Sequence, residues 1–296
     1  MQIAPKRFGD SLNEWFRALG RAWKPLLLSS LVVHVPLAVV VMSYFLASGA
    51  ADSFATILDP EALEDMTGDE VLDVVVPLLW PVGIWSLLQV VAGVFVYVAG
   101  ARVVAGHLAG SEYSWLTVSR FAATRLPAAL VVAFVVLAGA VFVVAVPIVA
   151  GWAMFAGLEI NFLTVFLTTT LALTALVVLV WLGVSVSLAI QVVAIEGASP
   201  LAALSRSFTL VRDRWWATIG FLLVIGIITS AVSQVASLPL IPIFAVGALI
   251  PEALVLGLSA SVVLQGPLLA AIAAGYALWY IDLRARREDL ASEDLF

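Results

Sequence analysis

The sequence predicts an all-α fold, namely a polytopic membrane helix bundle with six transmembrane helices. Three observations predict it. The 296 residues are 63% hydrophobic and 11% charged, with a mean hydropathy of +1.13, whereas soluble domains average about 45 to 50% apolar and about 25% charged residues. Long apolar runs recur along the chain, and every Lys and Arg lies in alternate connections between them. We therefore expect a single integral membrane domain, 1–296.

Six apolar runs are long enough to cross a bilayer, because about 20 helical residues span the hydrocarbon core. They occupy residues 26–47, 71–101, 126–158, 160–195, 217–235 and 253–281. The third and fourth runs almost merge, which predicts a long tilted hairpin. The stretch 237–251 is apolar but carries three prolines. It is expected to form an outer interfacial or re-entrant piece, which requires cover for its backbone.

Positive and negative residues lie on opposite sides of these runs. All 14 Lys and Arg residues occupy the segments before the first run, between the second and third, between the fourth and fifth, and after the sixth. The other connections hold only carboxylates, in the stretch 52–73 and at Glu159 and Glu252. By the positive-inside rule, both termini are expected to be cytoplasmic. The abundance of Arg, Ala, Val and Leu is typical of a bacterium of high genomic GC content, so we expect a bacterial plasma membrane.

An amphipathic stretch precedes each pair of runs. Apolar and aromatic residues recur at helical spacing in 8–23, 113–127 and 200–216, with Arg residues around the remaining face. A helix of this kind suits the headgroup plane of a membrane. We interpret the chain as three repeated units of about 1–101, 102–195 and 196–296. Each unit has one cytoplasmic interfacial amphipathic helix and two spans.

The third unit holds the most specific local pattern. It runs from Glu196 through Gly197, Ser199 and Pro200 to a stretch of alternating Ser, Arg and apolar residues, and the chain ends on an Arg-rich segment, 280–288. These stretches resemble the glycerophosphoryl diester phosphodiesterase membrane-domain family and its six-helix relatives. The resemblance implies fold and location. Because the phosphodiesterase chemistry of that family belongs to a separate soluble domain, the resemblance implies no activity for this chain.

The same unit supplies one set of candidate site residues. Ser199 and Pro200 are typical of the N-cap and first residue of a helix. Seven charged residues near it form a cluster with either a structural or a lipid headgroup role: Glu196, Arg206, Arg212, Arg214, Arg284, Arg286 and Arg287. Glu196 is expected to accept hydrogen bonds from free helix N–H groups or to pair with Arg206 or Arg212.

Polar residues inside the apolar runs form the second candidate set, because burying them in a membrane is costly unless they are paired or functional. They are His34, Gln89, Gln191, Gln234 and Gln265. His34 precedes Pro36 and is expected either to bond a carbonyl freed by that proline or to relay protons. The glutamines fit interhelical hydrogen bonds or a polar path for a solute.

The sequence contains no recognisable catalytic motif. It has no cysteine and only two histidines, His34 and His107, which excludes a thiolate site and a multi-histidine metal site. Phosphate-binding and nucleophile-elbow motifs are missing. We therefore expect no catalysis, no metal and no cofactor, and we expect membrane lipids or other membrane proteins, not nucleic acid, as partners.

Two functions remain from this reasoning. The first is a non-catalytic membrane scaffold that interacts with lipids or binds a partner. The alternative is a permease for a small molecule or a lipid, with a polar path between the spans. The repeats and the proline-rich stretch 237–251 favour the permease. The lack of paired charges within the spans argues against it. An intramembrane enzyme has no motif in its favour.

Overall fold

The computed structural model describes residues 4–48, 50–58, 66–111, 113–157, 161–247, 250–288 and 290. Within these ranges every regular element is helical. The elements are α1 (Phe8–Arg21), α2 (Trp23–Ser48), α3 (Ala50–Leu58), α5 (Gly68–Leu108), α6 (Trp115–Gly157), α7 (Phe162–Val186), α8 (Ala189–Glu196), α9 (Pro200–Arg212), α10 (Trp215–Ser237), the 3₁₀ turn η1 (Leu238–Leu240), α11 (Ile241–Gly247) and α12 (Pro251–Ala285).

Six helical stretches are long and apolar enough to cross a membrane. They are Trp23–Ser48, Gly68–Leu108, Trp115–Met154, Phe162–Glu196, Trp215–Gly247 and Glu252–Ala285. Each one contains most of a predicted apolar run. The prediction of an all-α, multi-pass membrane protein with six spans is therefore confirmed.

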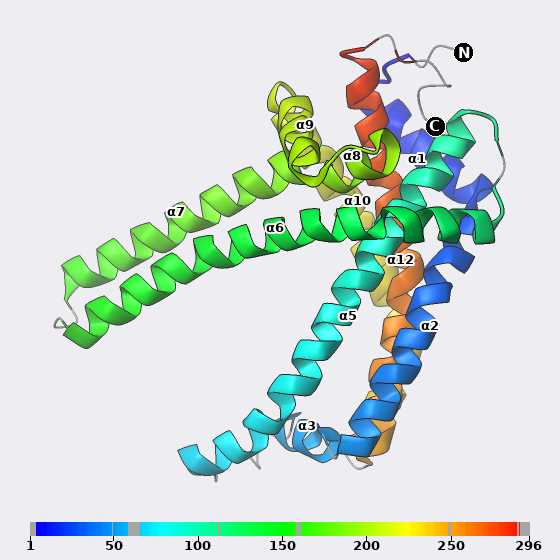
Figure 1. Ribbon diagram of the computed structural model, residues 1–296. Helices are drawn as coiled ribbons and strands as arrows, with labels where there is room; N and C mark the ends of the chain where they lie inside the picture. Colours follow the sequence, from blue (N-terminus) through cyan, green and yellow to red (C-terminus); the bar gives the residue numbers. More distant parts are fainter. Residues whose placement is uncertain are drawn as a thin grey trace.

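Two arms meet at one end of the molecule (Figure 1). One arm contains α2, α5 and α12, with α3 at its far end, and the other is the hairpin of α6 and α7, which diverges from the first. The helices α1, α8 and α9 and the last turns of α12 lie where the arms meet, close to both termini. We call α1, α8, α9 and residues 280–288 and 290 the polar cap. The described ends of the chain lie at this end, where Lys6 contacts Asp282, as an even number of spans requires.

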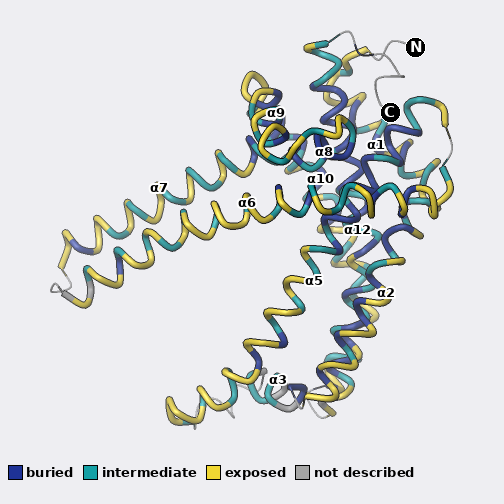
Figure 2. The backbone as a smooth tube through the Cα atoms, in the orientation of Figure 1, coloured by how far each residue is buried: buried dark blue, intermediate teal, exposed yellow. Residues whose placement is uncertain are grey.

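The α6–α7 hairpin is long and mostly exposed. With 43 residues, α6 is about 64 Å long, twice what a hydrocarbon core needs. Asn161 begins α7 by accepting hydrogen bonds from the backbone N–H groups of Leu163 and Thr164. Figure 2 shows exposed residues along most of both helices. The side chains of Phe134, Phe142 and Trp152 are about 70% exposed, which suits contact with lipid or with another membrane protein. The predicted long hairpin is confirmed, and its tilt in the membrane stays a prediction.

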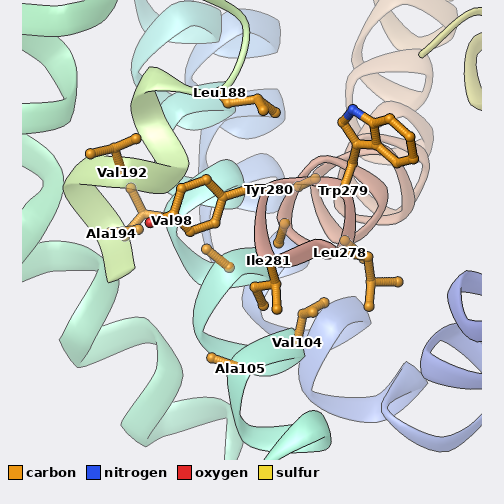
Figure 3. Packing of buried hydrophobic residues seen from close by; sticks show 14 of the residues in the cluster. Val98, Val104, Ala105, Leu188, Val192, Ala194, Leu278, Trp279, Tyr280 and Ile281 are labelled. Atoms are coloured by element: carbon orange, nitrogen blue, oxygen red, sulfur yellow. The ribbon is translucent and has the colours of Figure 1, made fainter. Parts of the chain in front are cut away.

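The core lies where the arms meet the cap. Figure 3 shows buried side chains of α5, α8 and α12 packed together, with the ring of Tyr280 extending from α12 toward α8. Gly100 allows close approach of α5 and α12, because a Cβ there would lie only 2.8 Å from the Cβ of Ala273. The indole of Trp15 is 1% exposed and donates a hydrogen bond to the carbonyl of Ala271 over 2.8 Å. α1 is thus anchored on α12.

The amphipathic stretches of the first and third units form the separate helices α1 and α9, but 113–127 does not form one. It is the beginning of α6, which continues through Pro127. The buried residues Val118, Ala122, Ala129 and Val132 lie three, four or seven residues apart, so one packed face continues across the proline. That packing compensates for the one hydrogen bond that a proline removes. The structure does not confirm the three-unit arrangement.

The proline-containing stretch after α10 does not re-enter the bundle in its described part, 237–247. η1 and α11 continue in the direction of α10, antiparallel to α12. Ile225 lies against Gly275, Phe244 against Gly257, and Gly247 against Leu254. Later residues of the α10–α11 stretch thus contact earlier residues of α12, as in an antiparallel pair. Pro239 lies in the first turn of η1, where its missing N–H costs nothing. The re-entrant alternative is therefore wrong for these residues.

Candidate functional site

The motif that begins the third unit forms the turn between α8 and α9. Gly197 follows Glu196 with a φ of 66°, the left-handed conformation in which helices commonly end. Ser199 is the N-cap residue of α9 and Pro200 its first residue, as predicted, although the Ser199 side chain does not bond the helix. The turn places Glu196 above the end of α12.

Glu196 is the centre of an ion-pair network that joins α8, α9 and α12. Its Oε1 accepts hydrogen bonds from Tyr280 Oη over 2.5 Å and from Arg206 Nε over 3.2 Å, and it lies 3.6 Å from Arg284 Nε. Both arginines also pair with Glu288, Arg284 over 2.9 Å. The network has a structural role, because each of its arginines pairs with a carboxylate of the protein itself.

Sequence reasoning identified only part of this network. Pairing of Glu196 with Arg206 is confirmed, and pairing with Arg212 is wrong. Tyr280 and Glu288 were missed. A signal for them exists, because Tyr280, Arg284 and Glu288 are spaced by four residues and so share one face of a helix.

Arg286 and Arg287, the remaining C-terminal arginines, form ion pairs and hydrogen bonds elsewhere at this end of the molecule. Arg286 pairs with Asp282 over 2.7 Å and donates to the carbonyl of Lys6. Asp282 in turn accepts a hydrogen bond from the backbone N–H of Lys6 over 2.6 Å. Arg287 pairs with Asp213, the residue after α9, over 2.5 Å. Both arginines therefore hold neighbouring segments against α12.

Glu14 is a second centre of charge in the cap, and the sequence analysis did not select it. It lies within 3.2 Å of Lys6, Arg17 and His107. Burial alone would raise the pKa of Glu14, but the hydrogen bonds and charges of Lys6, His107 and Arg17 outweigh it. The pKa therefore lies below its ordinary value. An ionised Glu14 ties α1 to the end of α5.

Arg212 and Arg214 have a different environment. They lie at one end of a groove of about 1020 Å³, which we call the α7–α10 groove. One wall consists of Val177, Val180 and Trp181 on α7, and the other of the residues that join α9 to α10. No described carboxylate lies within 4 Å of either guanidinium.

A similar pocket of about 760 Å³ lies at the junction of α1 and α2. We call it the α1–α2 groove. Arg21 and Lys24 line it, together with Trp23, Tyr113 and Trp115. Among the described residues, neither cation pairs with a carboxylate. Lys24 instead lies 5.7 Å from the ring centre of Trp23.

Three of the five predicted intramembrane polar residues share a cavity. His34, Gln89 and Gln265 line a pocket of about 370 Å³ together with Thr229, Ser230 and Ser233. We call it the polar pocket. Its lining comes from α2, α5, α10 and α12. The ring nitrogen Nδ1 of His34 donates to the carbonyl of Ser30 over 2.9 Å. The carbonyl that lacks a helical donor because of Pro36 is that of Val32. His34 therefore does not bond the carbonyl that the proline frees.

The other two glutamines lie elsewhere. Gln191 is fully buried on α8, and neither its Oε1 nor its Nε2 has a hydrogen-bond partner within the described structure. Gln234 is exposed near the end of α10 and does not line the polar pocket. The polar path that the permease alternative expects from the four glutamines therefore does not include Gln191 or Gln234. Gln89 and Gln265 converge.

The described residues contain no group of three or more His, Asp or Glu side chains that could hold a metal ion. Glu159 and much of the acidic stretch 52–73 lie outside the described residues. Within its described part, Glu70 has a structural role. Its carboxylate accepts a hydrogen bond from the backbone N–H of Thr67 over 2.7 Å and completes a capping box at the start of α5.

No protein-family model, curated protein or solved structure matches this chain. Its function is therefore inferred from its own residues.

Proposed function

We propose that this chain is a non-catalytic integral protein of a bacterial plasma membrane that binds lipids of the inner leaflet and acts as a scaffold. In this proposal the polar cap and both termini are cytoplasmic, as the charge distribution requires. The exposed α6–α7 hairpin faces lipid or a partner membrane protein.

Ten of the 14 cations fall into two groups, and the difference between these groups carries the proposal. One group pairs with carboxylates inside the cap: Lys6, Arg17, Arg206, Arg284, Arg286 and Arg287. A second group has no described carboxylate partner and lines the two grooves: Arg21, Lys24, Arg212 and Arg214. Cations near an anionic leaflet contribute about 1 kcal/mol each to binding. The first group organises the protein and the second is available for headgroups.

The positions of the two grooves also support the proposed repeat. Each groove lies at the junction between an amphipathic helix and the span that follows it, α1 with α2 and α9 with α10. Each junction places two cations beside tryptophan. We therefore retain the units 1–101, 102–195 and 196–296 as part of the proposal, and with them the membrane-domain family that 196–216 and 280–288 resemble.

A lipid analysis of the purified protein tests the lipid role. Protein extracted in mild detergent is expected to carry anionic phospholipids at a higher fraction than the membrane from which it came. A lipid content equal to that of the bulk membrane would contradict the proposal. Raising the ionic strength during purification should reduce the enrichment, because salt screens exposed charges.

The orientation is testable by cysteine labelling, since the chain has no cysteine of its own. Ser205→Cys places a thiol at an exposed position of the cap, and Asp69→Cys places one at the opposite end. A membrane-impermeant maleimide should label Asp69→Cys in intact cells and label Ser205→Cys only after permeabilisation. The reverse pattern would contradict a cytoplasmic cap.

A solute permease is the second candidate function, and the polar pocket favours it. A permease would make vesicles that contain the protein swell faster than empty vesicles in glycerol, xylitol or urea. Gln265→Leu should abolish that difference, and Gln234→Leu, outside the pocket, should not. The scaffold proposal expects equal swelling rates with and without the protein. A protein-dependent rate that Gln265→Leu abolishes would replace the scaffold by the permease.

A further inference from the structure

The α7–α10 groove combines an apolar channel with a positively charged end. Leu176, Val177 and Val180 line it along α7, and the side chain of Val177 is 67% exposed. Arg212 is the last residue of α9 and Arg214 the N-cap residue of α10. The charges therefore lie together at the cap, and the apolar residues extend from there along α7.

The positive charge at this end is not cancelled within the described structure. Asp213, between the two arginines, pairs with Arg287 of α12 over 2.5 Å. The carboxylate nearest in sequence is thus neutralised by a third cation. An anionic ligand at the groove would meet two guanidinium groups, which bind phosphate oxygens well because of their planar, forked donor geometry.

Tryptophans flank this end of the groove, which is typical of segments at the level of lipid headgroups. Trp215 Nε1 donates to the carbonyl of Trp181 over 3.3 Å, which joins the start of α10 to α7. The side chain of Trp216 is 81% exposed. Exposed tryptophan is typical of the membrane interface. Val177 precedes Trp181 by four residues, or about 6 Å along the helix, toward the apolar part of the hairpin.

We propose that the α7–α10 groove binds one anionic phospholipid, with its phosphate between Arg212 and Arg214 and one acyl chain along Val177 and Val180. This inference rests on the proposed lipid-binding function and gives it a site. It also separates two kinds of arginine. Arg206 and Arg284 are held by Glu196 and Glu288, so the phosphate does not bind them.

Native mass spectrometry of the protein released from phosphatidylglycerol and phosphatidylethanolamine nanodiscs tests the site. Arg212→Gln/Arg214→Gln should weaken retention of phosphatidylglycerol about 30-fold, from two cations at an anionic surface. The matched control is Arg7→Gln/Arg120→Gln. It removes the same charge from two exposed arginines that line neither groove. The control should retain the lipid.

A second pair of variants tests the acyl chain. Val180→Trp fills the groove without removing a charge, and it should reduce retention of phosphatidylglycerol. Val165→Trp, an exposed position on α7 outside the groove, should leave retention unchanged. Glycerol phosphate, which has the headgroup chemistry but no acyl chain, should not displace the bound lipid.

The outcomes separate this inference from the function on which it rests. Wild-type protein that retains no excess of phosphatidylglycerol would overturn both. If the wild type retains the lipid and Arg212→Gln/Arg214→Gln retains it equally, the groove is not the site and the general lipid role stands. Equal losses in the groove and control pairs would show binding by total surface charge and would overturn the site. Displacement by glycerol phosphate would overturn the acyl-chain contact.

Discussion

Tyr280 Oη lies 2.5 Å from Oε1 of Glu196, although 84 positions separate the two residues in the chain. The contact joins the end of α8 to the last turns of α12. Arg206 and Arg284 approach the same carboxylate, so one side chain connects three helices of the cap. The prediction for Tyr280 follows from this arrangement.

Tyr280→Phe removes the hydroxyl and keeps the ring. Because Tyr280 is fully buried and donates to the Glu196 side chain, we expect the free energy of unfolding to fall by about 2 kcal/mol. Thermal unfolding in detergent measures it. Tyr44→Phe is the control, since the Tyr44 side chain is 41% exposed. Equal unfolding temperatures for the two variants would show that the hydrogen bond adds no stability.

Gly197→Ala tests the turn between α8 and α9. Gly197 has a φ of 66°, and a Cβ there would lie 2.9 Å from Nη1 of Arg125. We expect a loss of about 1 to 2 kcal/mol from the left-handed backbone and a small further loss, because the flexible end of the Arg125 side chain must shift. Gly110→Ala is the matched control, with a φ of 71° and nothing within 4 Å of its Cβ. Chemical unfolding of both should show the larger loss at Gly197; the opposite order would contradict the close contact with Arg125.

The lowered pKa of Glu14 predicts a pH dependence of stability. Because this pKa is lower in the folded protein than in the unfolded chain, the ionised carboxylate stabilises the fold above the pH at which a free glutamate protonates. The contribution is lost as the pH falls through the folded-state pKa. Glu14→Gln should therefore unfold at a lower temperature at pH 7.

The difference between wild type and Glu14→Gln should shrink as the pH is lowered into the acidic range. Differential scanning fluorimetry between pH 7 and about pH 3 measures both proteins. Asp10→Asn, an exposed position on the same helix, should show a smaller effect. A constant difference at every pH would mean that the ionised carboxylate is not the cause.

Gln191→Leu tests a buried amide without a partner in the described structure. A buried polar group that makes no hydrogen bond costs about 1 to 3 kcal/mol, so the apolar replacement should raise the free energy of unfolding by about 1 kcal/mol. Gln234→Leu, at an exposed position, should change it by less than about 0.5 kcal/mol. Destabilisation by Gln191→Leu would show that the amide contributes to the fold.

Much of the cap and of its candidate site followed from local pattern. Apolar residues at helical spacing predicted α1 and α9, and Ser199 and Pro200 predicted the N-terminal end of α9. Arg212 and Arg214, which line the α7–α10 groove, were among the predicted site residues. Local pattern did not separate them from Arg206, because residue type and spacing do not show which carboxylate approaches which guanidinium.

The sequence by itself determined the number of spans and their common polar end, because a bilayer requires about 20 apolar residues for each crossing and cations mark the connections. Only the tertiary structure decided which polar side chains meet. It brought His34, Gln89 and Gln265 to one pocket and placed Gln191 and Gln234 elsewhere. It also continued α6 through Pro127. These outcomes depend on packing between helices that are distant in sequence. Hydropathy and periodicity along a single helix carry no information about that packing.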